Sequence, residues 1–301
     1  METSMMRGII PPILTPIDEK ECIHEEKLRK QVDFVIDGGV HGILAFGSNG
    51  EFYMFEEDEI KRGLDIILSQ TAGRVPVYLG IGAISTKKCI RLAQMGQEVG
   101  AAGISILQPM FLKPTDEEMY DHFSAIAKTI ASTPMLLYNN PGRTGYTMSS
   151  QLVLRLAETH SNIVGMKDSS GDMTQTAEFI RRTRHLDFKV FGGKDTLIFG
   201  TMAHGGAGAV CTTANMYPKL VCSIYERYIA GDIAGALEAQ YQLNPVRLSM
   251  DGSSFPVATK DMSNLMGLDV GMPYRPSLPS NEKQMAIMRE EMEKAGLLKK
   301  G

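Results

Sequence analysis

The sequence predicts a (β/α)8 TIM barrel of the α/β class, with a small C-terminal helical extension. Two observations lead to this fold class. Eight short apolar runs alternate with segments that carry helix signals between residues 8 and 213, and only helical patterns follow the eighth run. Strands that alternate with helices form a parallel sheet, and eight such repeats are the number that closes a barrel.

A doubly wound open sheet is the competing fold. Such a sheet usually has fewer strands and carries a Gly-rich phosphate-binding turn after its first strand. Here the first run is followed by TPIDEKECIHEE, which contains no GxGxxG. The barrel is therefore the preferred prediction. The eight predicted strands span residues 8–14, 42–46, 75–82, 102–109, 134–140, 162–167, 188–193 and 206–213.

The segments between the runs have the periodicity and the end signals of helices. From residue 24 to residue 36 four apolar side chains share one helical face, and glycines 38 and 39 end the pattern. These side chains are Leu28, Val32, Val35 and Ile36. Ser85 or Thr86 can cap a helix. The segment 114–130 opens with Pro, Thr and acidic residues, as a helix N-terminus should.

After the eighth run the chain carries four helical patterns, at 217–232, 233–250, 255–268 and 281–298. The first is assigned to the barrel, which predicts a catalytic barrel over residues 1–230 and a helical domain over 231–301. In the last pattern Met285, Met288 and Met292 recur at helical spacing and predict a buried stripe.

Composition excludes several classes of function. The 301 residues carry a net charge of −4 and no dense basic patch, which argues against nucleic-acid binding. The start of the chain lacks the apolar core of a signal peptide, and no run approaches the roughly 18 apolar residues of a membrane span. The four cysteines are scattered without CxxC spacing, which indicates reduced, mostly buried thiols of a cytoplasmic protein. Without HxxxH or HExxH, no metal site is expected.

Polar and glycine-rich sequences follow five of the predicted strands. They are FGSNGE, YNNPGRTG, KDSSGD, GGKD and VCTTAN, after the second, fifth, sixth, seventh and eighth runs. Catalysis in this type of barrel takes place at the carboxyl ends of the strands. We therefore expect these five sequences to meet in one site.

Lys167 ends the sixth apolar run. Residues alternate along a strand, so Ile163, Gly165 and Lys167 should share one face. If this face is the barrel interior, burial disfavours the charged ammonium, and a neutral amine can attack a carbonyl to form an imine. Gly165 would then leave room for substrate. The alternative is a solvated lysine at a strand end, paired with Asp168.

Three further side chains have both a functional and a structural interpretation. Tyr138 could shuttle protons, or could be an amphipathic tyrosine that ends a core strand. Ser48 lies in a Gly-bracketed turn whose N–H groups can face a small carboxylate, but it could also belong to an ordinary turn. Arg143, after Pro141-Gly142, could hold a second carboxylate in bidentate fashion, or form a surface ion pair.

Taken together, these residues resemble the dihydrodipicolinate synthase / N-acetylneuraminate lyase family of class I, Schiff-base pyruvate aldolases. The resemblance is carried by GSNGE, YNNPGRTG, the KDSSGD lysine and the GGKD turn, and it extends from GIIPPILTP to FPVATKDMSNLMGL. It implies that Lys167 forms the imine and that Tyr138 moves protons. It also implies that Ser48 and the N–H of Asn49 hold the pyruvate carboxylate, and that Arg143 holds the carboxylate of a second substrate.

The resemblance implies further contacts and an assembly. Gly193 and Val210 should line the pocket around the imine, and Ser169 and Asp195 are further predicted substrate contacts. Family members are usually homotetramers, as dimers of dimers, with no metal or organic cofactor. The partners expected are therefore a 2-keto acid, pyruvate, and an aldehyde.

The chain also departs from the family pattern. The synthases usually have Thr-Thr where Ser48-Asn49 stands, and a tyrosine pair where Met110-Phe111 stands. Phe111 has no hydroxyl to complete a proton relay across a dimer interface. Sialic acid lyases usually have an acid where Thr196 stands.

Three interpretations follow. The first is a pyruvate-forming aldolase or lyase acting on another 2-keto acid, such as a 2-keto-3-deoxy sugar acid. The second is a dihydrodipicolinate synthase that condenses pyruvate with aspartate semialdehyde. The third, of another class, is a non-catalytic barrel that binds a keto acid.

Overall fold

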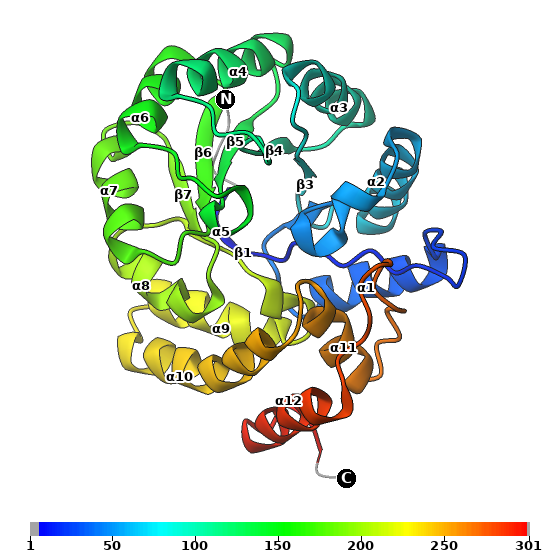
Figure 1. Cartoon of the computed structure of the whole chain (residues 1–301). Coiled ribbons are helices and arrows are strands. Elements are labelled where there is room, and N and C mark those ends of the chain that lie inside the picture. The colour runs from blue at the N-terminus through cyan, green and yellow to red at the C-terminus, as the bar shows by residue number, and fades with distance from the viewer. Residues whose placement is uncertain (1–5, 300–301) are drawn as a thin grey trace.

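A computed structural model of the chain describes residues 6–299, and Figure 1 shows a ring of strands surrounded by helices. The outermost residues of both predicted domains, 1–5 and 300–301, lie outside the described residues. The strands are β1 (Gly8–Ile10), β2 (Ile43–Ala45), β3 (Val77–Ile81), β4 (Gly103–Leu107), β5 (Met135–Asn139), β6 (Ile163–Asp168), β7 (Lys189–Gly192) and β8 (Gly208–Val210).

Helices follow the strands in alternation. Those of the barrel are α1 (Glu25–Asp37), α2 (Glu57–Thr71), α3 (Thr86–Val99), α4 (Asp116–Thr129), α5 (Pro141–Thr144), α6 (Ser150–Thr159), α7 (Met173–Thr183), α8 (Ile198–Ala203) and α9 (Pro218–Ile229). The C-terminal helices are α10 (Ile233–Ser249), α11 (Val257–Leu265) and α12 (Glu282–Lys294). Short 3-10 turns are η1 (Ser48–Gly50), η2 (Phe52–Met54), η3 (Asp195–Leu197), η4 (Thr212–Asn215) and η5 (Met250–Gly252).

The eight strands are parallel and run in the order β1-β8-β7-β6-β5-β4-β3-β2. The ring closes just after β1, where Pro12 and Leu44 form a parallel bridge. The N–H of Leu44 donates to Pro11 O at 2.9 Å, and the N–H of Ile13 donates to Leu44 O at 3.0 Å. The predicted (β/α)8 barrel is therefore confirmed.

The first strand is shorter than predicted, with three residues in place of the run 8–14. Pro11 and Pro12 have no N–H, so this stretch cannot sustain a regular ladder. The carbonyl of Pro11 and the N–H of Ile13 still bond to Leu44 of β2, while the carbonyl of Pro12 accepts from Asn215 Nδ2 at 3.0 Å. The strand is short because Pro11 and Pro12 lack N–H donors, but the barrel still closes at this point.

Helix ends lie where the sequence predicts them. Ser85 caps α3, its side chain accepting from the N–H of Lys88. Thr115 and Glu118 form a capping box at the start of α4, each side chain accepting from the other's backbone N–H. The predicted face of α1 is buried at Leu28, Val32 and Val35, whereas Ile36 is only partly buried.

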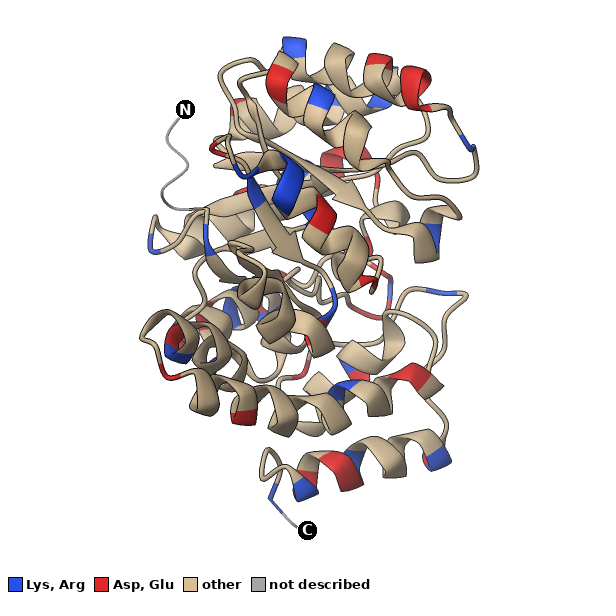
Figure 2. Ribbon diagram, turned by 90° about the vertical axis from the view of Figure 1, so that its left-hand side faces the viewer, with Lys and Arg blue, Asp and Glu red and all other residues tan. Residues whose placement is uncertain are grey.

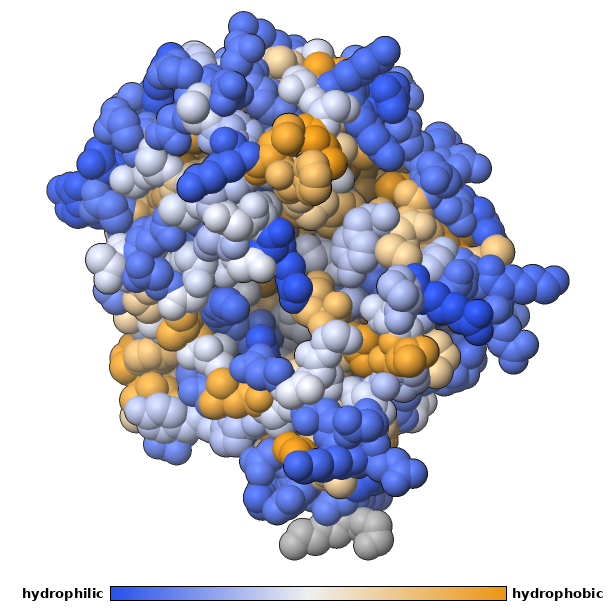
Figure 3. All heavy atoms as spheres, in the orientation of Figure 1, coloured by the Kyte–Doolittle hydropathy of each residue, from blue (hydrophilic) through white to orange (hydrophobic). Residues whose placement is uncertain are grey.

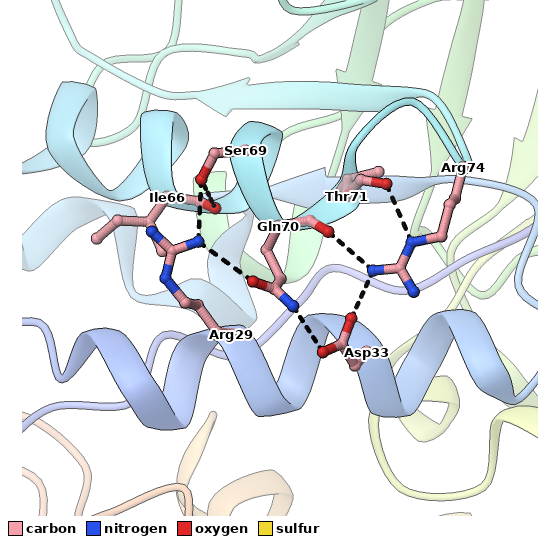
Figure 4. A network of polar contacts seen from close by, with 7 residues as sticks. All are labelled: Arg29, Asp33, Ile66, Ser69, Gln70, Thr71 and Arg74. Atoms are coloured by element: carbon pink, nitrogen blue, oxygen red, sulfur yellow. Dashed lines mark hydrogen bonds and ion pairs between the residues drawn. The ribbon is translucent and has the colours of Figure 1, made fainter.

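A polar network joins α1 to α2 on the outside of the barrel (Figure 4). Arg29 donates to Ser69 Oγ at 3.0 Å and to Gln70 Oε1 at 3.2 Å. Gln70 donates in turn to Asp33, which also pairs with Arg74. Acidic and basic segments are interspersed over the outer helices in the same way (Figure 2). These surface pairs fix neighbouring helices, although each exposed pair contributes only about 0–1 kcal/mol.

The C-terminal helices have a core of their own. Met288 and Met292 are fully buried there and Met285 is partly buried, which confirms the predicted stripe. The remaining buried members of this cluster are Met216, Tyr217, Val246, Met250, Ala258 and Met262. In Figure 1 α10, α11 and α12 lie to one side of the ring. The division between residues 230 and 231 stays a prediction.

The described residues do not include a helix with the length and apolarity that a membrane crossing requires. All four cysteines are free, and Cys89, Cys211 and Cys222 are buried, as predicted, while Cys22 is exposed. Between residues 6 and 299 no group of three or more His, Cys, Asp and Glu side chains is placed to hold a metal ion.

Candidate active site

Lys167 and Tyr138 lie side by side at the carboxyl ends of β6 and β5. Their Cα atoms are direct partners in the strand register, and Lys167 Nζ lies 4.5 Å from the centre of the Tyr138 ring. Lys167 is only 5% exposed. The alternative of a solvated lysine at a strand end therefore does not hold. The two side chains share a buried position, as imine chemistry requires.

Asp168 does not pair with Lys167. Its carboxylate accepts from Asn139 Nδ2 at 2.8 Å, from Ser170 Oγ at 2.8 Å and from Thr176 Oγ1 at 2.6 Å. Asn139 and Asp168 thus form a second cross-strand pair, next to Tyr138 and Lys167 along the chain. This pair holds the ends of β5 and β6 together and leaves Lys167 free of a carboxylate partner in the described part of the chain.

Gly165 and Lys167 share one face of β6, as predicted, since they pair with Leu136 and Tyr138 of β5, but Ile163 does not belong to this face. Val164 packs in a cluster of strand residues inside the barrel, whereas Ile163 and Met166 pack with the helices. The register between β5 and β6 shifts next to Ile163, so strict alternation fails. Gly165 also leaves no room for substrate, because an added Cβ would lie 2.5 Å from Lys189 O on β7. Its role is the close approach of two strands.

The Tyr138 phenol lies in a polar network. Asn140 Nδ2 donates to its oxygen at 2.8 Å. Burial alone would raise the pKa of Tyr138, but the charge of Lys167 and hydrogen bonds from Ser169, Ser48 and Asn140 act the other way, and the net pKa lies below its ordinary value. A phenol with a lowered pKa gives up its proton more readily, which suits a proton shuttle.

Ser48 and Asn49 form the start of the turn η1, and both are buried. The N–H groups of Gly50 and Glu51 donate back to Gly47 and Ser48 within the turn. The N–H groups of Ser48 and Asn49 precede these bonds and have no acceptor among residues 6–299. They are therefore available to a carboxylate, as predicted.

Side chains from distant segments hold Asn49. Asn49 Nδ2 donates to Thr212 Oγ1 at 2.9 Å, and Thr259 Oγ1 donates to Asn49 Oδ1 at 3.1 Å. Thr212 follows β8 and Thr259 belongs to α11. The C-terminal extension therefore takes part in shaping the turn that carries Ser48.

Glu51, at the end of the same turn, forms a buried ion pair with Lys260 of α11. Lys260 Nζ lies 2.6 Å from Glu51 Oε2, and neither side chain reaches solvent. Lys260 also donates to Met272 O at 2.8 Å, and the N–H of Tyr274 donates to Glu51 Oε1 at 3.0 Å. Burial lowers the pKa of Lys260, while the charge of Glu51 opposes this shift.

Glu51 has a left-handed backbone, with φ of 55°. A glutamate is uncommon in this region, and the ion pair holds it there. The sequence interpretation assigned no role to Glu51, Thr259 or Lys260. The final E of GSNGE was the available signal, because an acidic residue directly after a buried turn needs a partner.

Arg143 lies in α5, after β5, with its Cζ 4.4 Å above the centre of the Phe255 ring. No carboxylate of the described residues lies within ion-pair distance of it, so the surface ion pair does not form. Arg143 and Phe255 both line a cavity of about 470 Å³, together with Thr212 and Thr259. Figure 3, drawn from the same side as Figure 1, is hollowed near the middle of this face.

Gly193 and Ser169 lie against the lysine. A Cβ at Gly193 would lie 2.0 Å from Ser169 Oγ and 3.0 Å from Lys167 Cε. Val210 ends β8 and is buried inside the barrel. The Asp195 carboxylate is turned toward β8, where it accepts from the N–H and the hydroxyl of Thr213, both at 2.6 Å. This geometry gives Asp195 a structural contact, and its contact with substrate stays a prediction.

Phe111 lies apart from these residues, in the loop after β4. It is 93% exposed and has a positive φ of 69°. The structure thus brings Ser48, Ser169 and Gly193 together with Lys167 and Tyr138. Asn49 follows Ser48 in the turn, Val210 lies inside the barrel, and Arg143 lies at a cavity that shares Thr212 with Asn49.

Comparison with known proteins agrees with this geometry. The Dihydrodipicolinate synthetase family model matches residues 5–295. The chain is 35% identical to 4-hydroxy-tetrahydrodipicolinate synthase of Methanopyrus kandleri, over 98% of both chains. It is 36% identical to the enzyme of the same name from Thermus thermophilus, again over 98% of both chains.

Solved structures show the same likeness. The YagE protein of E. coli K12, solved in complex with pyruvate, has a TM-score of 0.93 at 28% identity, covering 97% of this chain and 99% of the other. A dihydrodipicolinate synthase of Thermotoga maritima has a TM-score of 0.94 at 28% identity, covering 97% and 99%.

These matches exclude one of the three interpretations and favour another. The chain is an enzyme of the lyase type, a pyruvate aldolase of class I, so the non-catalytic barrel is set aside. The names of the relatives favour the second interpretation, the synthase, over the first. The resemblance noted in the sequence is confirmed, and the chain belongs to the dihydrodipicolinate synthetase family.

Proposed function

We propose that the chain condenses pyruvate with aspartate semialdehyde through an imine at Lys167, the reaction of a 4-hydroxy-tetrahydrodipicolinate synthase. The observation that carries the proposal is the buried pair of Lys167 and Tyr138, with Ser48 within hydrogen-bonding reach of the phenol. The relatives named for this reaction support the choice of acceptor.

The reaction begins when Lys167 gives up its ammonium proton and its amine attacks C2 of pyruvate. The C2 oxygen leaves as water and an imine forms. Loss of a proton from C3 gives an enamine, whose C3 adds to the aldehyde carbon while the aldehyde oxygen takes up a proton. The amino group of the joined product then attacks C2 and displaces Lys167. Tyr138 carries protons to and from the oxygens at C2 and at the former aldehyde.

Two groups of residues hold the substrates in this scheme. Ser48 and the N–H of Asn49 bind the pyruvate carboxylate, with Gly193 and Val210 around the imine. Arg143, held over Phe255, binds the carboxylate of the aldehyde in bidentate fashion. The imine itself is the electron sink, so the proposed chemistry needs neither a metal ion nor an organic cofactor.

Borohydride reduction in the presence of pyruvate tests the imine. Intact-mass measurement should find a pyruvyl adduct on the wild-type chain and none on Lys167→Ala. Coupled assay of the condensation product should show turnover with aspartate semialdehyde. A wild-type chain that yields no adduct would sink the proposal.

Cleavage of 2-keto-3-deoxy sugar acids is the second candidate function. Phe111 favours it, because a side chain without a hydroxyl cannot serve the relay expected of a synthase. Pyruvate release from a panel of such acids, compared with condensation on the same preparation, separates the two. Adduct formation with cleavage but no condensation would replace the first proposal by the second.

Assembly and location complete the proposal. We expect a homotetramer in the cytoplasm, as the family resemblance and the free thiols suggest. A monomeric dihydrodipicolinate synthase variant has a TM-score of 0.94 with this chain, so the fold also suits a monomer. Sedimentation equilibrium would distinguish one, two and four chains per particle.

A further inference from the structure

Lys194 lies in the turn between β7 and α8, and its neighbours are fixed on both sides. The N–H of Gly193 donates to Asp168 O at 2.7 Å. The Asp195 carboxylate is held by Thr213, as described above. The backbone of Lys194 is therefore anchored to β6 on one side and to the loop after β8 on the other.

The Lys194 side chain runs across the rim of the site. A Cβ added at Gly171 would lie 3.3 Å from Lys194 Cε, so the stem of the lysine passes over a glycine that has a positive φ of 77°. Lys194 lines the same cavity of about 470 Å³ as Arg143 and Thr212. The Lys194 side chain thus extends along the cavity wall.

The charges around this cavity do not balance. Arg143, Lys194 and Arg247 line it as cations, and Asp251 lines it as the one carboxylate. Arg247 Nη1 pairs with Asp251 Oδ1 at 2.7 Å. Neither Arg143 nor Lys194 has a carboxylate within ion-pair distance among residues 6–299. Two unpaired cations on the wall of one cavity create a local preference for an anion.

The cavity also adjoins the reacting centre. Thr212, in its wall, accepts the hydrogen bond from Asn49 that fixes the predicted pyruvate cradle. Gly193, next to Lys194 in the chain, is the residue whose added Cβ would meet Lys167 Cε at 3.0 Å. A group bound between Arg143 and Lys194 would therefore lie close to the predicted pyruvate cradle.

We propose that Lys194 is a specificity-determining residue that, with Arg143, selects acceptor aldehydes carrying an anionic group at the end away from the carbonyl. This inference rests on the proposed function, because it assigns the acceptor side of the same site. Aspartate semialdehyde is such an acceptor because it carries a distal carboxylate. Its ammonium group plays no part in recognition by Lys194.

The experiment compares three acceptors in pyruvate condensation: aspartate semialdehyde, succinic semialdehyde and butyraldehyde. The second keeps the distal carboxylate without the ammonium, and the third has no charge. Because neither of these two has an amino group to displace Lys167, water hydrolyses the product imine in its place. Lys194→Met should lower kcat/KM about tenfold for both anionic acceptors, mainly through KM, and leave butyraldehyde unchanged. Lys194→Glu should lower kcat/KM for the two anionic acceptors further, and Lys194→Arg should retain most of the wild-type value.

Control measurements separate this inference from the proposed function. Lys128→Met removes an exposed lysine of α4 that does not line the cavity, and should leave all three values unchanged. Borohydride trapping of pyruvate should proceed equally in Lys194→Met and wild type. Absence of trapping in the wild type would refute the proposed function. Normal trapping, with equal losses for all three acceptors or no loss for any, would overturn only the role of Lys194.

Discussion

Lys167 and Tyr138 are paired in register across β6 and β5, and the Lys167 Nζ lies 4.5 Å from the centre of the Tyr138 ring. The parallel ladder of the barrel holds the backbones of both residues. The neighbouring pair of Asn139 and Asp168 reinforces this anchor. The two strands thus fix the positions of the nucleophile and its proton shuttle, while Asn140, Ser48 and Ser169 from the adjoining turns hold the phenol.

Replacing Tyr138 by Phe should keep the ring against Lys167 and remove only the proton shuttle. We expect kcat for condensation to fall roughly 100-fold or more, because general acid–base catalysis commonly contributes a factor of this size. Pyruvate trapping at Lys167 should persist at a lower rate. Tyr120→Phe is the matched control, since its hydroxyl lies on the outside, 3.3 Å from Thr159 Oγ1. An unchanged kcat in Tyr138→Phe would contradict the assigned role.

Gly193→Ala should block the site by steric overlap. The new methyl would lie 2.0 Å from Ser169 Oγ and 3.0 Å from Lys167 Cε. We expect pyruvate trapping to slow more than tenfold, and stability to fall by about 1–3 kcal/mol as for other overpacked cores. Adding Ser169→Ala removes the nearest atom and should recover part of the stability. Gly200→Ala serves as control, because its nearest contact would be an ordinary 3.6 Å. Trapping at the wild-type rate in Gly193→Ala would show that the lysine has more space than the structure indicates.

The sequence predicts most of the barrel for a simple reason. Apolar runs and helix caps are local signals, and the carboxyl ends of parallel strands must meet, so the sequence alone could place Lys167, Tyr138 and Ser48 together. Local signals also misled in two places. Pro11 and Pro12 end β1 early, and the register shift beside Ile163 changes which side chains of β6 face inward.

The contacts that hold the site together were beyond such reasoning. Lys260 and Thr259 lie far along the chain from Glu51 and Asn49, and nothing in the local pattern of α11 shows that a lysine there is fully buried. Only the packing of the C-terminal helices against the barrel brings them to the turn. Asp195 shows the opposite case, since its position near the site was predicted but its carboxylate is engaged by Thr213.

Lys260→Met should leave Glu51 as an unpaired buried charge. Breaking a buried pair in this way costs about 3–5 kcal/mol of unfolding free energy. The double variant Lys260→Met with Glu51→Gln removes the stranded charge and should recover more than half of the loss. Both variants should raise KM for pyruvate, because Glu51 ends the turn that carries Ser48.

Denaturant unfolding followed by circular dichroism measures this effect. Lys61→Met is the control, because its ion pair with Asp65 is long, at 3.5 Å, and exposed, and should contribute about 0–1 kcal/mol. A double variant no more stable than Lys260→Met would mean that lost packing, and not the stranded charge, causes the damage.

His122 should make stability depend on pH. It is buried on α4, with Nδ1 2.9 Å from Thr86 Oγ1, and burial lowers its pKa from 6.5 to about 4. The unfolded chain takes up this proton near pH 6.5, whereas the folded chain resists it until about pH 4. The unfolded state therefore binds more protons between these values, and the free energy of unfolding falls as the pH drops through this window. The contribution of neutral His122 to the free energy of unfolding is fully present above pH 6.5.

Urea unfolding at several pH values from 4 to 7.5 measures this dependence. The share of His122 in the loss is on the order of 3 kcal/mol at the lower end, from the shift in its pKa. His122→Gln should be less stable at pH 7, because the packing and the contact with Thr86 change, yet its stability should fall less steeply below pH 6.5. His204→Gln, at an exposed position, should keep the wild-type slope. His122→Gln removes one titrating group only. If its unfolding free energy falls with pH as steeply as that of the wild type, groups other than His122 cause the acid sensitivity.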